Sequence, residues 1–277
     1  MNIKRALQLA NEEFIDSGIE NYFFEVRELL GAVLEKSKEW IMINMEYDIP
    51  EEKYDKFLEL KKARIQGAPF QYILGEQYFM GFKFLVNEDV LIPRSDTEIL
   101  VYKIIDMFKN TEKIKILDVC TGSGCIAISL AKLLKDSDVS ALDISKDALN
   151  VAKRNAESNS ADIKFYESDL FNNILDDEFD IIVSNPPYIA SDKINALASD
   201  VLREPRLALD GGADGLRFYR EISRNGRNYL KENGVIAFEI GYDQAELVEN
   251  ILKELRYKDI EVIKDYSGND RVLVARK

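Results

Sequence analysis

Hydrophobic positions recur at helical spacing over the first quarter of the chain. Apolar residues follow one another at intervals of three and four between residues 3 and 34, and Gly18 interrupts the pattern, which predicts at least two amphipathic helices. A further helix is predicted over about 50–65, ending before Gly67-Ala68-Pro69. We therefore expect residues 1–75 to form a small helical domain.

The period of the pattern shortens after this segment. Aromatic and aliphatic residues alternate with polar ones over residues 76–95, and Gly81 provides a turn, so a β-hairpin is expected to link two domains. A helix is predicted over 99–108, and either Ser95 or Asp96 could be its N-cap.

The rest of the chain, residues 96–277, begins with the helix just described. Buried strands and amphipathic helices then alternate along it. This pattern is typical of an α/β fold with a mostly parallel sheet. Seven strands are predicted, at residues 114–119, 139–143, 163–166, 180–184, 235–240, 260–263 and 272–275. Four further helices are predicted, at residues 125–134, 146–156, 215–231 and 242–255.

The amino-acid composition limits the classes of protein, reaction and binding site that fit this chain. Of the 277 residues, 46% are hydrophobic and 31% charged, as in ordinary soluble proteins, and no apolar run reaches membrane-spanning length or forms a signal-peptide core. We therefore expect a cytoplasmic protein. There is no histidine, which excludes Ser-His and Cys-His nucleophile pairs; with only Cys120 and Cys125, we expect no metal site and reduced thiols. The net charge of −13 disfavours a surface that grips phosphate backbones.

A glycine-containing loop follows the first strand predicted for the sheet. It comprises Cys120, Thr121, Gly122, Ser123 and Gly124. The loop lacks the third glycine of a dinucleotide fingerprint and the Lys-Ser/Thr of a Walker loop. The next strand ends in Asp143, which could accept both hydroxyls of a ribose, and Phe171 follows the third strand, where it could cover an adenine. Each feature alone could be an ordinary strand-end turn or surface carboxylate, but their order predicts a nucleoside without phosphates, and S-adenosylmethionine fits that description.

The strand predicted at 180–184 stops at Asn185-Pro186-Pro187-Tyr188. Two prolines donate no backbone N–H, so the strand ends in a rigid turn. The Asn185 Oδ1 atom and the Pro186 carbonyl could accept the N–H groups of an amide or an amino-heterocycle, and Tyr188 could cover its face. By itself the tetrapeptide is equally compatible with a simple strand-terminating turn.

Taken together, these motifs resemble the protein-(glutamine-N5) methyltransferases of peptide chain release factors, the PrmC/HemK family. The matching stretches cover nearly the whole chain and are Gly67–Gly75, Leu91–Glu98, Leu117–Ala127, Asn185–Ile189, Glu204–Pro205, Ala208–Gly212 and Asp214–Leu216. One departure is Cys120, where the family usually has glycine; because cysteine is small, we expect the loop to keep its shape. The resemblance implies a Rossmann-like, S-adenosylmethionine-dependent methyltransferase sheet joined by the hairpin to the helical domain.

The resemblance also implies an activity and a partner. A methyl group would pass from S-adenosylmethionine to the side-chain amide nitrogen of the glutamine in the Gly-Gly-Gln motif of a release factor. Asn185 and the Pro186 carbonyl would hold the amide, Pro187 and Tyr188 would pack on it, and Arg94 would help to bind the substrate. The helical domain would dock the release factor, and we expect the enzyme to be a monomer that binds no nucleic acid.

Two other functions are compatible with parts of the sequence. Adenine-N6 nucleic-acid methyltransferases share Asn-Pro-Pro-Tyr, but they need a basic groove or a recognition domain, which the net charge disfavours. A non-catalytic adaptor would bind a partner through the helical domain, and the intact glycine loop, Asp143 and Asn185 argue against it.

Overall fold

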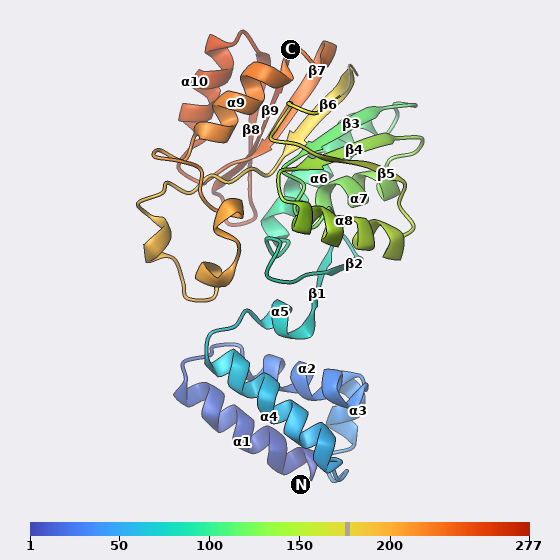
Figure 1. The fold of residues 1–277 in the computed structure, drawn as a ribbon, viewed down its shortest axis with the longest axis vertical. Helices are drawn as coiled ribbons and strands as arrows, with labels where there is room; N and C mark the ends of the chain where they lie inside the picture. Colours follow the sequence, from blue (N-terminus) through green and yellow to red (C-terminus); the bar gives the residue numbers. More distant parts are fainter. Residues whose placement is uncertain (175–177) are drawn as a thin grey trace. The chain divides into compact units, whose positions relative to one another are not determined.

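The computed structural model describes residues 1–174 and 178–277. The chain divides into two compact units (Figure 1). The helical unit comprises Met1–Gly75 together with Ser199–Arg203, and the sheet unit comprises Glu76–Ala198 and Glu204–Lys277. No helix within the described ranges is both long and apolar enough to cross a membrane.

The helical unit contains five helices in its described N-terminal segment. They are α1 (Ile3–Asp16), α2 (Tyr22–Leu34), α3 (Lys38–Ile43), α4 (Glu51–Ile65) and α5 (Phe70–Leu74). Their apolar faces bury a common core that includes Phe14, Leu30 and Phe57. Helix α3 is absent from the sequence prediction because its six residues are too few to show a period; the Ser37 hydroxyl caps it by accepting a hydrogen bond from the Trp40 N–H.

The predicted hairpin forms from β1 (Glu76–Phe79) and β2 (Phe82–Leu85), which pair antiparallel. It is an integral part of the sheet unit and not a free-standing linker. Phe79 and Phe84 are buried in the core of that unit. The Asn155 side chain accepts a hydrogen bond from the Leu85 N–H (2.7 Å) and donates one to the Leu85 carbonyl (3.0 Å).

The predicted seven-stranded, mostly parallel sheet is confirmed (Figure 1). Its strands are β3 (Lys115–Val119), β4 (Asp138–Asp143), β5 (Ile163–Glu167), β6 (Phe179–Ser184), β7 (Leu230–Glu239), β8 (Lys258–Lys264) and β9 (Asp270–Arg276). The spatial order is β5-β4-β3-β6-β7-β9-β8, and β9 runs in the opposite direction to the other strands described in this sheet. The order reverses between β3 and β6, so a crevice is expected beyond the carboxyl ends of these two strands.

Helices cover both faces of the sheet (Figure 1). One face packs against α6 (Ser95–Phe108), α7 (Cys125–Leu133) and α8 (Lys146–Ser158), and the other against α9 (Arg217–Gly226) and α10 (Ala245–Glu254). The sheet is therefore apolar on both sides, which explains why its central strands are continuous hydrophobic runs in the sequence.

Two local predictions are wrong. The helix predicted at 215–231 ends at Gly226, and the chain joins β7 from Leu230. Gly226 packs against the sheet so closely that a Cβ atom there would lie 3.0 Å from Phe171 Cζ and 3.1 Å from Ile182 Cδ1. Tertiary packing, not helical periodicity, therefore sets the end of α9.

Neither Ser95 nor Asp96 caps α6. Arg94 occupies the N-cap position, and no side chain makes a capping hydrogen bond there. Asp96 instead pairs with Arg271 at 3.3 Å, and Glu98 accepts a hydrogen bond from the Met80 N–H at 2.5 Å. Both acidic side chains fasten the first turn of α6 to other elements of the sheet unit.

Candidate active site

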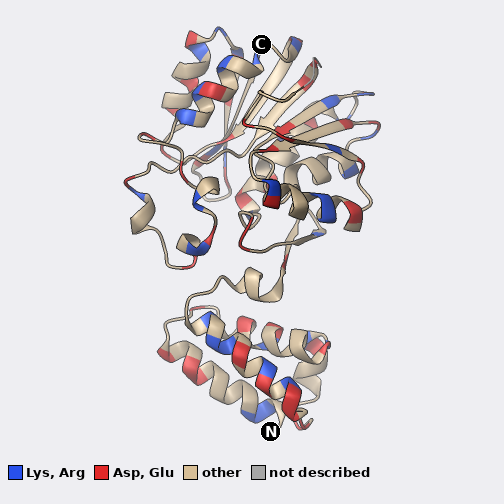
Figure 2. Ribbon diagram, viewed as in Figure 1, with Lys and Arg blue, Asp and Glu red and all other residues tan. Residues whose placement is uncertain are grey.

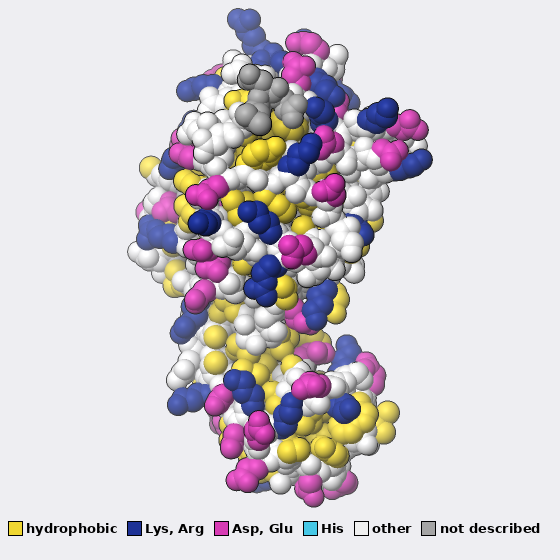
Figure 3. Space-filling model, turned by 45° about the vertical axis from the view of Figure 1, so that its right-hand side comes forward, with side chains coloured by type: hydrophobic (Ala, Val, Ile, Leu, Met, Phe, Trp, Pro, Cys, Tyr) yellow, Lys and Arg dark blue, Asp and Glu magenta, His cyan; other side chains and the backbone are white. Residues whose placement is uncertain are grey.

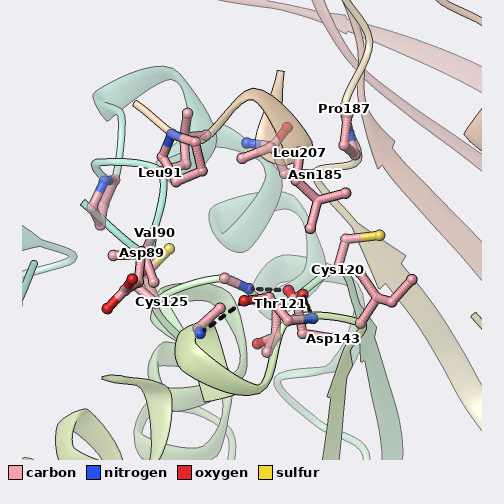
Figure 4. A pocket seen from close by; sticks show the side chains of 18 of the residues that line it. Asp89, Val90, Leu91, Cys120, Thr121, Cys125, Asp143, Asn185, Pro187 and Leu207 are labelled. Carbon is pink, nitrogen blue, oxygen red and sulfur yellow. Dashed lines mark hydrogen bonds between the residues drawn. The ribbon is translucent and has the colours of Figure 1, made fainter. Parts of the chain in front are cut away.

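A cavity opens at the carboxyl ends of β3, β4 and β6, where the strand order predicts a crevice (Figure 4). The cavity is partly open to solvent, and residues from the segment before α6 and from the loop after Glu204 complete its lining. Eight residues singled out from the sequence line it: Arg94, Cys120, Thr121, Gly122, Ser123, Asp143, Asn185 and Pro187.

The glycine loop between β3 and α7 bends through left-handed backbone conformations. Cys120 has φ +61° and Gly122 has φ +54°. A non-glycine residue in this left-handed conformation costs about 1–2 kcal/mol, so glycine would fit position 120 with less strain. Cys120 adopts the conformation at that cost. Burial raises the pKa of the Cys120 thiol well above its usual value, so the thiol is neutral. A Cβ atom at Gly122 would meet nothing within 4 Å, so the loop leaves open space there.

Gly124 does not line the cavity, although it was predicted to contact the cofactor. Its φ is +81°, and a Cβ atom would lie 3.1 Å from Ile128 Cδ1 and 3.2 Å from Ala152 Cβ. The glycine is therefore required where α7 approaches α8.

Asp143 ends β4 with only 9% of its surface exposed, and it lines the cavity. One carboxylate oxygen accepts the Gly122 N–H and the other the Ser145 N–H, each at 2.9 Å. These bonds fix the carboxylate plane and leave each oxygen a lone pair for a further donor. Burial raises the pKa of Asp143, and the two backbone hydrogen bonds oppose that shift.

Asp118, which the sequence analysis did not single out, lies buried beneath the glycine loop. Its Oδ2 atom accepts hydrogen bonds from the Thr121 hydroxyl (2.6 Å) and the Ala127 N–H (3.3 Å). The Oδ1 atom has no hydrogen-bond partner among the described residues. Burial raises the pKa of Asp118 to about 7. The signal in the sequence is an aspartate inside a strand that is otherwise apolar.

The substrate-binding residues predicted in the turn after β6 do not all line the cavity. Asn185 and Pro187 line the cavity, whereas the side chains of Pro186 and Tyr188 do not. None of the described residues donates a hydrogen bond to the Pro186 carbonyl. The Tyr188 phenol donates to Glu239 Oε1 at 3.3 Å, and burial raises the pKa of Tyr188.

A glycine-rich segment supports the backbone of this turn from behind. Cβ atoms at Gly211 and Gly215 would lie 2.8 Å and 2.4 Å from the carbonyl oxygens of Pro187 and Tyr188, respectively. The Gln244 side chain donates a hydrogen bond of 2.9 Å to the same Tyr188 carbonyl. This segment is among the stretches that match the family, and no role was predicted for it. The structure shows that its glycines allow its backbone to lie close to the backbone of the turn.

Arg94 lies at the cavity with its guanidinium paired to the buried carboxylate of Glu204. Glu204 Oε2 also accepts the Ile92 N–H at 3.0 Å. The pair therefore fastens the segment before α6 to the loop that contains Glu204-Pro205. Glu204 is a second residue that the sequence analysis quoted without a role.

Phe171 does not form the predicted adenine shelf. It is 6% exposed, packs in the hydrophobic core and stacks on Tyr229 with ring centroids 5.1 Å apart. Phe171 follows β5, as the sequence indicates, but its ring packs in the core and does not line the cavity. An apolar surface is available elsewhere, because Ile144, next to Asp143, lines the cavity and is 50% exposed.

Comparison with known proteins decides the family. The family model described as PrmC N-terminal domain matches residues 5–75, and the one described as Methyltransferase small domain matches residues 96–216. A release factor glutamine methyltransferase of Clostridium botulinum is 43% identical over 266 residues, covering 94% of each chain. The enzyme of that name from Clostridium acetobutylicum is 41% identical over 280 residues, covering 99% of this chain and 98% of that one. The chain belongs to the release factor glutamine methyltransferase family.

Solved structures agree on the fold of this family member. A methyltransferase from Pyrococcus furiosus is similar with a TM-score of 0.55 at 18% identity, covering 72% of this chain and 90% of that one. A 16S rRNA methyltransferase of Thermus thermophilus, solved with AdoMet and guanosine, has a TM-score of 0.52 at 18% identity, covering 73% of this chain and 49% of that one. The predicted family and fold are confirmed, and this release factor glutamine methyltransferase homologue is an enzyme of the methyltransferase class.

Proposed function

We propose that this enzyme transfers a methyl group from S-adenosylmethionine to the side-chain amide nitrogen of the glutamine in the Gly-Gly-Gln motif of peptide chain release factors. The observation that carries the proposal is the turn after β6. It presents an amide side chain, Asn185, to a cavity whose far side holds the Asp143 carboxylate, and the adjacent Pro186 carbonyl has no donor among the described residues. The names of the relatives indicate the substrate.

The residues around the cavity fit S-adenosylmethionine. Asp143 retains a lone pair on each oxygen for the ribose hydroxyls, and the half-exposed Ile144 offers an apolar surface for the adenine. The open space at Gly122 leaves room for a ligand next to the backbone. The Asp143 carboxylate adds negative potential at this edge, which suits a cation. When bound, S-adenosylmethionine supplies an electrophilic methyl group on a positively charged sulfur.

The task of the protein is to orient a poor nucleophile. The lone pair of an amide nitrogen is delocalised into its carbonyl, so the nitrogen reacts only if its geometry is constrained. Asn185 Oδ1 and the Pro186 carbonyl accept its two N–H groups and point the nitrogen at the methyl group. Such positioning contributes roughly 7–11 kcal/mol when the geometry is close to attack. The nitrogen would form a bond to the methyl carbon as the bond between that carbon and the sulfonium sulfur breaks, which leaves a neutral thioether. The nitrogen would also lose one proton to solvent; this proton becomes acidic during the transfer, so no general base is required.

The helical unit has the second role in this proposal, which is to dock the release factor. Large apolar side chains gather on its surface (Figure 3). Phe23, Phe24 and Met42 are more than half exposed, and Ile43 is 82% exposed. Contiguous exposed apolar patches are typical of protein-binding surfaces. A Phe23→Ser, Ile43→Ser double variant should raise KM for the intact release factor and leave methylation of a short Gly-Gly-Gln peptide unchanged. Tyr266→Ser, which changes a 92% exposed side chain of the sheet unit, is the control.

Adenine methylation in nucleic acid is the alternative chemistry for the same turn. Charges of both signs alternate along α4, and the net charge is −13, which is unlike the basic stripe of nucleic-acid-binding proteins (Figure 2). The decisive experiment incubates the enzyme with S-adenosylmethionine and either a purified release factor or an adenine-containing oligonucleotide, followed by mass spectrometry. A gain of one methyl group on the glutamine, absent when that glutamine is replaced by alanine, supports the proposal. Methylation of the oligonucleotide alone would refute it.

A further inference from the structure

A buried carboxylate lies directly behind the turn that contains Asn185. Glu239 is the last residue of β7, the strand that pairs with β6, and it is 2% exposed. Burying a carboxylate is costly unless donors satisfy it. Two hydroxyls do so: Thr97 Oγ1 lies 2.5 Å from Oε2, and the Tyr188 phenol oxygen lies 3.3 Å from Oε1.

The hydrogen bond to Glu239 determines what Thr97 can offer Asn185. A threonine hydroxyl has one hydrogen, and an ionised carboxylate can only accept. With its hydrogen donated to Glu239, the Thr97 oxygen can act towards Asn185 only as an acceptor. Asn185 Nδ2 lies 3.2 Å from Thr97 Oγ1 and donates to it.

The direction of this bond matters because the two ends of an asparagine amide are similar in shape and opposite in hydrogen-bonding character. Rotation by 180° about the last side-chain bond exchanges the oxygen and the nitrogen. If the hydrogen of Thr97 were free, it could donate to the Asn185 oxygen, and the NH₂ group would then face the cavity. An NH₂ group facing the cavity would repel the N–H groups of an incoming amide.

We propose that Glu239 is a positioning residue: through Thr97 it orients the Asn185 amide so that Oδ1 faces the cavity as the acceptor for the substrate. The inference rests on the proposed function in one respect, that the group to be methylated carries N–H donors. The orientation of Asn185 itself follows from the Glu239–Thr97–Asn185 chain of hydrogen bonds whatever the substrate is.

The surroundings of Glu239 hold its carboxylate in place. The pKa of Glu239 is raised overall, because burial outweighs the lowering effects of the Thr97 hydrogen bond and the charge of Arg271. Arg271 is itself held by Asp96 at 3.3 Å and by Asp265 at 3.2 Å. Two hydroxyl donors, one on each oxygen, match an ionised carboxylate, which is an acceptor at both positions.

The backbone of Glu239 is anchored as well. The buried Tyr219 phenol donates a hydrogen bond of 3.0 Å to the Glu239 carbonyl and lies 3.3 Å from Gln244 Oε1. Gln244 in turn donates to the backbone carbonyl of Tyr188. The carboxylate and the turn that it orients are thus held by one set of contacts, so rotation of the Glu239 side chain away from Thr97 is disfavoured.

Glu239→Gln tests the proposal because it keeps the shape and removes one acceptor. Its NH₂ group must face either Thr97 or Tyr188, so one hydroxyl loses its acceptor. We expect Glu239→Gln and Thr97→Val to lower the single-turnover rate of methyl transfer about 10- to 100-fold, somewhat less than loss of a group that acts on the substrate directly. The dissociation constant of S-adenosylmethionine should change less than twofold. Thr97→Ser keeps the hydroxyl and should retain most of the wild-type rate.

A double-mutant cycle separates positioning from a general structural effect. If Glu239 acts through Asn185, then Glu239→Gln should have little further effect in an Asn185→Ala background. Additive losses in the cycle, or a wild-type rate for Thr97→Val, which removes the hydroxyl itself, would overturn the proposal.

A measurement on the protein without substrate keeps the inference independent of the proposed function. Hydrogen exchange of the Asn185 side-chain NH₂ group, followed by NMR, should be slow in the wild type and at least several-fold faster in Glu239→Gln and Thr97→Val. Equal exchange in the three proteins would refute the orientation itself. Slow exchange in an enzyme that methylates no release factor would refute only the proposed substrate.

Discussion

Replacing Gly215 by alanine tests how precisely the turn after β6 must be placed. Gly215 has φ +74°, and a Cβ atom there would lie 2.4 Å from the Tyr188 carbonyl oxygen and 2.9 Å from Gln244 Nε2. Ordinary contacts of a Cβ atom begin at 3.4 Å. The Tyr188 carbonyl must therefore move by about 1 Å (3.4 − 2.4), and the hydrogen bond that Gln244 donates to it is strained or lost.

The magnitudes follow from these contacts. The left-handed conformation costs alanine about 1–2 kcal/mol, and loss of the hydrogen bond costs about 0.5–1.5 kcal/mol. We therefore expect Gly215→Ala to lower the free energy of unfolding by about 1.5–3.5 kcal/mol. A displacement of about 1 Å at a positioning group can lower a reaction rate by about 10²-fold, so kcat should fall by that order. Affinity for S-adenosylmethionine should be nearly unchanged, since neither Gly215 nor Tyr188 lines the cavity.

A matched control separates backbone strain from collision. Gly268 has φ +87° in the same sheet unit, and a Cβ atom there would meet nothing within 4 Å. Gly268→Ala should therefore lose about 1–2 kcal/mol of stability and keep full activity. Urea unfolding and single-turnover methyl transfer to a release factor measure the two effects. The reasoning fails if Gly215→Ala transfers methyl groups at the rate of Gly268→Ala.

Substitutions at three further positions should give distinct outcomes. Asp143→Ala should weaken binding of S-adenosylmethionine by about 1.5–3 kcal/mol, the usual contribution of a charged hydrogen-bond partner, and unchanged affinity in calorimetry would remove Asp143 from the site. Asn185→Ala should lower kcat and kcat/KM together by about 10²–10³, and Asn185→Asp should bind S-adenosylmethionine but methylate glutamine poorly; full single-turnover activity of Asn185→Ala would contradict its proposed role. The pKa of Asp118 is about 7 in the folded protein, against a reference value of 3.8. Between these two pH values the folded protein therefore binds one proton more than the unfolded chain. The free energy of unfolding falls as the pH rises through this window. Asp118→Asn should remove up to about 4 kcal/mol of that fall between pH 4 and 8, and urea unfolding with the same pH slope in both proteins would show that Asp118 is not the group responsible.

Local sequence patterns predicted the strands of the sheet and most of the helices. Alternating apolar runs and amphipathic segments predicted all seven strands because such patterns depend on residues close in the chain. The same local patterns predicted that Asp143 and Asn185 lie at one edge of the sheet, where both line the cavity, since the ends of parallel strands meet at the same edge. A glycine at position 122 likewise signals a left-handed bend without reference to the rest of the fold.

Predictions from local patterns were wrong where a residue could have faced either the cavity or the protein interior. Phe171 follows a strand and could have faced either the cavity or the core; contact with Tyr229 and Gly226 selected the core. Gly124 could equally have served a ligand or a helix contact, and the approach of α8 at Ala152 decided for the contact.

Only the tertiary structure could bring together groups that are distant in the chain. The hydrogen bond from Thr97 to Glu239 spans 142 positions, and that from Arg94 to Glu204 spans 110. No local period relates such residues, because their proximity depends on the strand order that sets β6 between β3 and β7. The sequence alone therefore determined that Asn185 stands at the end of a strand, and the packing of α6 and β7 behind it decided which way its amide faces.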